Sequence, residues 1–181
     1  MHFNKKHHLF VLISPNAMRS WCVAFVVTFC LANPSFARDS IKGIWIDETG
    51  RGAVQILPCL DAGNYIHTTT GGAILCGHIV WIDHDRDERG QPLKDNLNED
   101  PEKRKRVICG LQIISDLKYQ LDGTWEKGRI YDPRRGRTFD LAVRLLSEDQ
   151  LEVTGYLGAK FLGKSFVWKR ASQDIGTCQK E

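Results

Sequence analysis

The sequence predicts an all-β domain that closes into an eight-stranded antiparallel up-and-down barrel. From residue 41 onward, short apolar or alternating segments recur between turn signals, and few stretches have an apolar period of 3.6 residues. Gly43-Ile44-Trp45 opens the first segment and Trp168-Lys169-Arg170 closes the last. Closure would remove the exposed edges of the sheet. A two-sheet sandwich is the alternative, and spacing alone does not exclude it.

The N-terminal 37 residues are typical of an export signal. An apolar run of eleven residues, 21–31, is followed by Ser35-Phe36-Ala37, which has the form of a cleavage site. Positive charge in this segment comes from Lys5, Lys6 and Arg19. We therefore predict a signal peptide over residues 1–37, cleavage after Ala37 and a periplasmic or secreted protein.

The start and the fate of this segment have alternatives. Met18-Arg19 would open a conventional signal by itself, so Met18 is an alternative start. A transmembrane helix needs about 20 apolar residues, more than the run supplies, so we expect no stable membrane anchor.

The remaining residues, 38–181, have the length of one domain with a single core. The chain has 25 Lys and Arg residues and 22 Asp and Glu residues. Three of the basic residues and none of the acidic ones lie in the signal, so the domain carries 22 basic and 22 acidic residues. This balance argues against a nucleic-acid partner, which is held by neutralising phosphates.

Eight segments of the domain have the length and the pattern of strands. Their residues are 41–47, 53–59, 73–82, 106–115, 124–131, 137–146, 150–157 and 164–170. The alternation is clearest in 137–146, whereas 73–82 is apolar on both faces. Either a homodimer or the terminal segments could cover that second face. A long polar loop, 83–105, separates the third and fourth strands.

If the strands run up and down, four connections meet at one open end, namely 47–51, 83–105, 132–136 and 158–163. The stretch YDPRRGRTF, residues 131–139, then places Arg134 and Arg135 at the mouth. We interpret it first as a hairpin tip shaped by Pro133 and Gly136. The alternative is an anionic ligand held by Arg134, Arg135 and Lys160. The long loop contains eight acidic residues that could neutralise the arginines.

The domain keeps four cysteines, which suggest two disulfides in an oxidising compartment. Alternating strands bring Cys59 and Cys76 together at the closed end, so we predict that bridge. Cys109 with Cys178 follows by elimination and requires the C-terminal tail to fold back along the barrel wall.

No metal or cofactor is predicted. The chain has no C-x-x-C or H-x-x-x-H spacing. The acidic run from Asp83 fails the EF-hand pattern at Glu88, where glycine is needed, and at Lys94, where the bidentate glutamate belongs.

Two resemblances extend this interpretation. Gly43 and Trp45 in the first strand and Arg170 in the last resemble lipocalin and fatty-acid-binding barrels, in which a late basic residue covers the tryptophan. Leu75-Cys76-Gly77-His78-Ile79-Val80-Trp81 and Gly128-Arg129-Ile130-Tyr131-Asp132-Pro133 resemble the bacterial secreted family called domain of unknown function 2147. That resemblance implies an exported β-rich domain without an established role. The segment between Cys59 and Cys76 is longer than the short turn we expect there, and it could hold an extra strand.

Three functions are open at this point. The first is an exported barrel that binds a small molecule, and the second is a structural or protein-interaction module of the envelope with a filled core. The third is an enzyme, for which Tyr131, Asp132 and His78 are the only candidates; we expect no catalytic site. The ligand-binding candidates are Trp125, Tyr131, Asp132, Arg134, Arg135 and Phe139.

Overall fold

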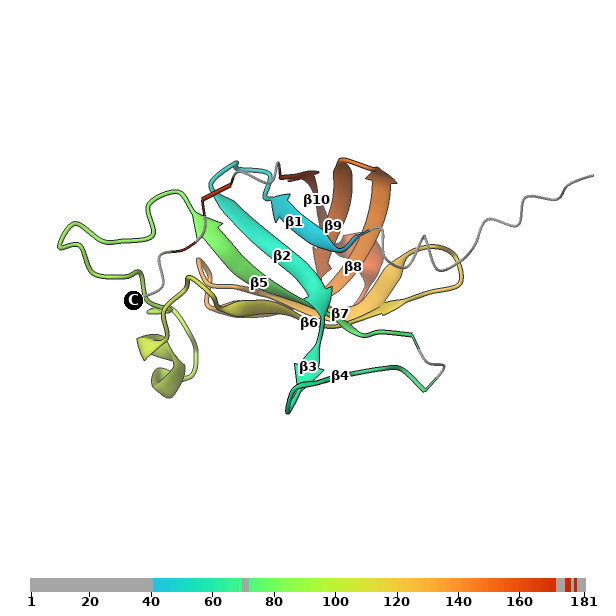
Figure 1. Ribbon diagram of the computed structural model, residues 1–181, viewed down its shortest axis with the longest axis horizontal. Helices are drawn as coiled ribbons and strands as arrows, with labels where there is room; N and C mark the ends of the chain where they lie inside the picture. Colours follow the sequence, from blue (N-terminus) through green and yellow to red (C-terminus); the bar gives the residue numbers. More distant parts are fainter. Residues whose placement is uncertain (1–40, 70–71, 172–174, 177, 179–181) are drawn as a thin grey trace, which may run out of the picture. The chain divides into compact units, whose positions relative to one another are not determined.

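A computed structural model describes residues 41–69, 72–171, 175–176 and 178. The predicted signal peptide lies outside these residues. Eight strands close into an antiparallel barrel in the order β1-β10-β9-β8-β7-β6-β5-β2, which confirms the predicted fold class (Figure 1). The strands are β1 (Gly43–Ile46), β2 (Gly52–Pro58), β5 (Leu75–Ile82), β6 (Gln112–Tyr119), β7 (Trp125–Asp132), β8 (Arg137–Ser147), β9 (Gln150–Tyr156) and β10 (Lys164–Arg170).

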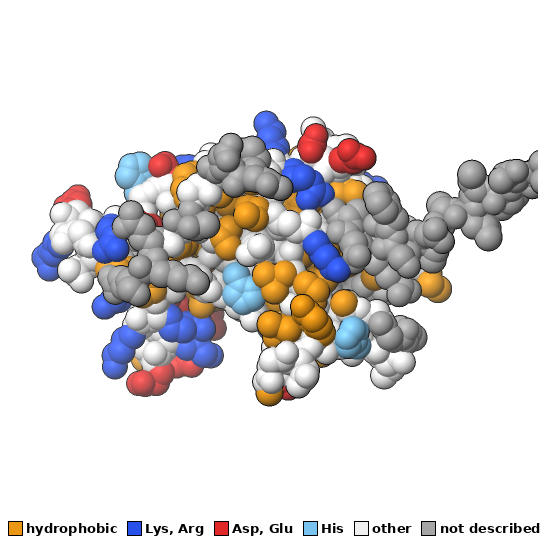
Figure 2. Space-filling model, viewed as in Figure 1, with side chains coloured by type: hydrophobic (Ala, Val, Ile, Leu, Met, Phe, Trp, Pro, Cys, Tyr) orange, Lys and Arg blue, Asp and Glu red, His pale blue; other side chains and the backbone are white. Residues whose placement is uncertain are grey.

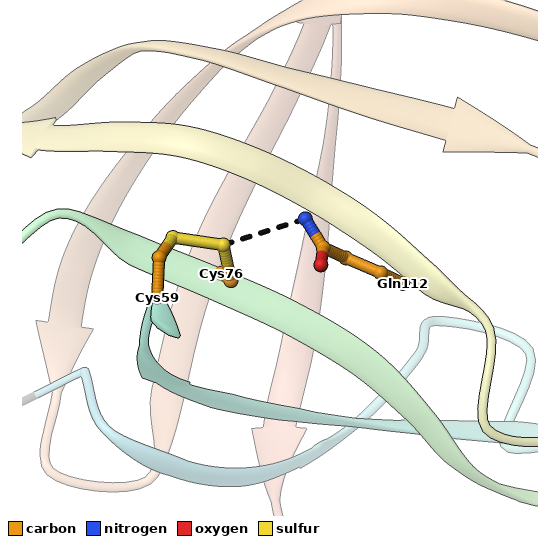
Figure 3. The surroundings of a disulfide bond; sticks show 3 residues. All are labelled: Cys59, Cys76 and Gln112. Carbon is orange, nitrogen blue, oxygen red and sulfur yellow. Dashed lines mark hydrogen bonds between the residues drawn. A yellow bond between two sulfur atoms is a disulfide. The ribbon is translucent and has the colours of Figure 1, made fainter. Parts of the chain in front are cut away.

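The segment between Cys59 and Cys76 forms a hairpin outside the barrel rather than a short turn. Its strands are β3 (Leu60–Asp61) and β4 (Asn64–Tyr65). Ala62 and Gly63 between them both have positive φ, the conformation that two-residue hairpin turns require. A disulfide between Cys59 and Cys76 closes the base of the hairpin, and the Gln112 side chain donates to the Cys76 sulfur at 3.4 Å (Figure 3).

The fourth barrel strand begins six residues later than predicted, at Gln112 instead of Arg106. Before Gln112 the chain still belongs to the loop: the Ile108 amide donates a hydrogen bond to the Leu93 carbonyl, and Gly110 turns the chain with a φ of 86°. The strand also continues past Ser115 to Tyr119, because Lys118 and Tyr119 pair with the start of β7. Asp116 within it has a φ of 59°, and Leu117 is fully buried.

The closed end of the barrel holds the packed core. Trp45 is fully buried, its indole nitrogen donates to the Ile41 carbonyl at 2.8 Å, and the Arg170 guanidinium lies 4.1 Å from its ring centre. Arg170 also donates to the carbonyl of Lys42. Gly43 allows this approach, since a Cβ there would lie 3.0 Å from Arg170.

The C-terminal segment lies against the outer face of β5. Cys178 is bonded to Cys109, and its amide donates to the Val80 carbonyl at 2.7 Å. Gly176 lies beside the Trp81 ring. A terminal segment therefore covers part of the outer face of β5, the strand that the sequence predicts to be apolar on both faces.

The helices of the described residues are two short 3-10 turns, η1 (Pro101–Lys105) and η2 (Lys160–Leu162). Within the described ranges, no helix has the length and apolar character that crossing a membrane requires.

Candidate functional site

A cavity of about 880 Å³ lies inside the barrel on the mouth side of the core. Val54, Val153 and Trp168 belong both to the core and to the cavity lining, so the cavity begins directly where the core ends. Further apolar side chains form its walls: Ile79, Ile82, Ile108, Ile113, Ile130, Phe139 and Phe166. The interior is therefore suited to an apolar molecule or an apolar part of one.

The mouth of this cavity is built by the four connections that the sequence places at one end. The β1–β2 turn contributes Asp47, Glu48, Thr49 and Arg51, and the long β5–β6 loop contributes His84 and Leu93. The β7–β8 turn contributes Arg134 and Arg135, and the β9–β10 turn contributes Leu157 and Leu162. Charged and apolar side chains thus share the rim.

The stretch 131–139 is a hairpin tip, as first interpreted. The Asp132 carboxylate accepts a hydrogen bond from the Arg134 amide at 3.0 Å, and the Asp132 carbonyl accepts one from the Arg135 amide. The same carboxylate lies 3.5 Å from the guanidinium groups of both arginines. Asp132, rather than an acidic residue of the long loop, therefore balances Arg134 and Arg135. Both side chains remain more than half exposed at the mouth, where ion pairs are weak.

A buried carboxylate fastens the long loop to β7. Asp95 is fully buried and accepts hydrogen bonds from Arg106 at 2.7 Å, from Asn98 at 2.8 Å and from the Tyr131 hydroxyl at 2.5 Å. Burial, together with the Asp95 carboxylate, raises the pKa of Tyr131 to about 12. Because every partner of Asp95 is polar or charged, this part of the loop is held by a compact polar network.

The loop approaches the β7–β8 hairpin closely at a second point. Gly136 has a φ of 65°, and a Cβ there would lie 1.7 Å from the Leu97 carbonyl oxygen. Only glycine fits this approach, so the tip and the loop are packed together on one side of the mouth (Figure 1).

A second, polar hollow of about 540 Å³ lies between η1, β6 and the β7–β8 hairpin. Its basic side chains are Lys103, Arg106, Arg129 and Arg137. Tyr131 lines both this outer hollow and the inner cavity.

The structure brings most, but not all, of the predicted residues to the cavity. Tyr131, Asp132, Arg134, Arg135 and Phe139 line it. Trp125 does not: it is buried in the core against Tyr119, with ring centres 5.2 Å apart, because β7 starts at the closed end.

Two other candidates lie away from the predicted group. Lys160 is ion-paired with Glu126 on β7 and is not part of the cavity lining. His78 is separate from Tyr131 and Asp132; its Nδ1 atom is buried without a hydrogen-bond partner in the described residues, and burial lowers its pKa.

Sequence reasoning missed Tyr156 and Gly155 at the end of β9, both of which line the cavity. The Tyr156 hydroxyl makes no hydrogen bond with any described residue, so it is available to a ligand. Both residues directly precede the β9–β10 turn, which the sequence places at the mouth, and this position could have identified them as cavity residues.

A closed barrel with Arg170 stacked on the tryptophan of a Gly-x-Trp strand, and with an apolar cavity above it, defines a lipocalin-like protein. The chain belongs to the family described as "Uncharacterized protein conserved in bacteria (DUF2147)", whose model matches residues 43–170.

One solved structure similar to this chain is protein HP1028 from Helicobacter pylori, described as belonging to the lipocalin family. The two chains share 24% identity with a TM-score of 0.53, over 74% of this chain and 84% of the other. This likeness concerns the fold. No curated protein matches the sequence.

Proposed function

We propose that this protein is an exported carrier or receptor of a small amphipathic molecule, with the apolar part of the ligand inside the barrel and its polar end at the mouth. The observation that carries the proposal is the cavity of about 880 Å³ with aliphatic and aromatic walls. Cavities of this size can enclose a small organic ligand. A filled core, which the structural-module alternative requires, does not agree with this cavity.

The polar end of the ligand has three partners in the proposal. Arg134 and Arg135 are exposed at the rim and are balanced only by Asp132 among the described residues, so an anionic group can compete for them. Tyr156, which also lines the cavity, adds a hydroxyl donor. Tyr131 contributes its ring rather than its hydroxyl, because the hydroxyl is already bonded to Asp95 and Asn98.

Export rests on the sequence of residues 1–37 and agrees with the two disulfides of the barrel, since disulfides persist in oxidising compartments. Native mass spectrometry of the protein purified gently from a bacterial periplasm should show a chain beginning at Arg38 and a small adduct that is lost on denaturation. The adduct would give the mass of the ligand.

The cavity itself is tested by filling it. A Cβ on Gly155 would lie 3.8 Å from the Phe139 Cβ and 4.0 Å from Ile130, which is ordinary contact, so Gly155→Phe places a ring in the cavity without backbone strain. We expect this variant to bind the anionic apolar dye 8-anilinonaphthalene-1-sulfonate at least about tenfold more weakly, since apolar burial is lost.

The matched control for this test is Lys169→Phe, which adds the same side chain at an exposed position of β10. It should bind the dye as the unmodified protein does. If Gly155→Phe folds with an unchanged melting temperature and retains full dye binding, the cavity is not the site.

A further inference from the structure

We propose that the β9–β10 turn, residues 157–163, docks the mouth of the barrel on a phospholipid bilayer surface. This inference rests on the proposed function, because it concerns how an apolar ligand enters the cavity. It starts from three large apolar side chains on this single turn: Leu157 is 56% exposed, Phe161 87% and Leu162 74%.

The turn presents these side chains from a fixed backbone. The Leu162 amide donates to the Ala159 carbonyl, and the Gly163 amide donates to Lys160. Gly163 packs tightly against β9, since a Cβ there would lie 2.9 Å from the Tyr156 Cβ. Lys160 is further tied to Glu126. Because the turn holds its shape, Phe161 remains in water unless a partner covers it.

The apolar surface of the turn is continuous with the cavity. Leu157 and Leu162 line the cavity and are also largely exposed, so they connect its interior with the outside. A ligand with an apolar body could pass along these side chains into a bilayer without crossing water. Docking of a protein partner would not explain why the exposed apolar side chains continue into the cavity lining.

Basic side chains accompany the apolar ones. Lys164 follows the turn directly, and Arg134 and Arg135 stand on the neighbouring hairpin of the same mouth. Phenylalanine and leucine beside lysine and arginine are the combination found where proteins lie in the interface of a membrane. Asp47 at the same rim bonds to Thr49 and to the Arg51 amide of its own turn. The cavity lining also holds the acidic residues Glu48, Asp83 and Asp132, so binding should depend mainly on the apolar side chains and little on anionic lipid.

A second exposed apolar region serves as the internal control. Leu60 on the β3–β4 hairpin is 55% exposed, and hydrophobic side chains gather around this hairpin (Figure 2). The hairpin follows the end of β2 at the closed end, so it does not adjoin the mouth.

The test uses the purified, disulfide-bonded protein and vesicles of phosphatidylcholine, with or without phosphatidylglycerol, in a flotation assay without ligand. We expect Phe161→Ser to weaken vesicle binding about tenfold or more, since burial of one phenyl ring is lost. Leu60→Ser should bind as the unmodified protein does. No vesicle binding, equal losses in both variants, or a change only in self-association would overturn the proposal.

A kinetic measurement distinguishes this proposal from the proposed function. If the barrel contacts the bilayer, the rate of dye transfer from protein to vesicles should rise with vesicle concentration, and Phe161→Ser should abolish that rise. Phe161 does not line the cavity, so its substitution should leave dye affinity without vesicles unchanged. A transfer rate independent of vesicle concentration, with normal dye binding, would overturn membrane docking alone. Full dye binding by Gly155→Phe would overturn the cavity site alone.

Discussion

At the closed end of the barrel Trp45 and Trp125 are almost completely buried, whereas at the mouth Arg134 and Leu162 stand mostly exposed around a cavity of about 880 Å³. The same eight strands form both ends. The closed end is filled by side chains that contact one another, and the mouth is held open by turns fastened through polar groups. Fold stability should therefore depend mainly on the closed end, and ligand affinity mainly on the mouth.

The strongest test of this division is Trp45→Ala. The substitution removes a fully buried indole and leaves Arg170 without the ring on which it lies, so we expect a loss of about 3–5 kcal/mol in the free energy of unfolding. Urea unfolding followed by far-ultraviolet circular dichroism measures it. Phe139→Ala, which opens onto the cavity, should cost only about 1 kcal/mol. Equal losses at the two positions would contradict the division.

The next largest effect is expected from the disulfide at the base of the β3–β4 hairpin. Cys59 and Cys76 are 17 residues apart, and opening such a loop should cost about 3 kcal/mol on a chain-entropy model. The double substitution Cys59→Ser and Cys76→Ser should lower the urea midpoint and leave dye affinity unchanged. A loss of dye binding in the folded double variant would show that the hairpin shapes the mouth.

A smaller effect, confined to the mouth, is expected from Gly136→Ala. The added methyl group would meet the Leu97 carbonyl, and the positive φ adds strain, together about 1–3 kcal/mol. We expect faster hydrogen exchange at the amides of Asp95 and Asn98, which the loop protects. Gly90→Ala is the matched control, since Gly90 has a φ of 74° in the same loop but no atom within 4 Å of its Cβ position. If both variants exchange alike, the contact with Leu97 does not hold the loop.

The contrast between the two ends also explains how much of the molecule could be predicted. The eight strands and the mouth follow from alternation and turn residues, which act locally along the chain. Residues 106–111 have the apolar character of a strand but are held by the loop, through the Ile108 to Leu93 hydrogen bond and the ion pair of Arg106 with Asp95. These two interactions join residues that are distant in the sequence, so the local pattern of apolar residues does not predict them.

Two site residues show the same limit. Asp95 is one of eight acidic residues in a polar loop, and nothing in the sequence distinguishes it, yet it alone among them is fully buried. Trp125 has the composition of a cavity residue, but its position at the first residue of β7 places it in the core. The type of a residue predicts which interactions its side chain can make. Its position along the strand, near the closed end or near the mouth, decides whether a ligand can reach it.

The smallest effect, visible only at alkaline pH, comes from Tyr131 and tests whether the loop is fastened as described. The folded protein raises the pKa of this phenol from its ordinary value near 10 to about 12, so the neutral form is favoured in the folded state. The resulting stabilisation is complete below pH 10 and is lost as the pH rises from 10 to 12. In an absorbance titration, Tyr131 should ionise late, and Tyr131→Phe should remove that late step. If the titration has no late step that Tyr131→Phe removes, Tyr131 does not donate to Asp95 in solution, and the loop is free to move away from the mouth.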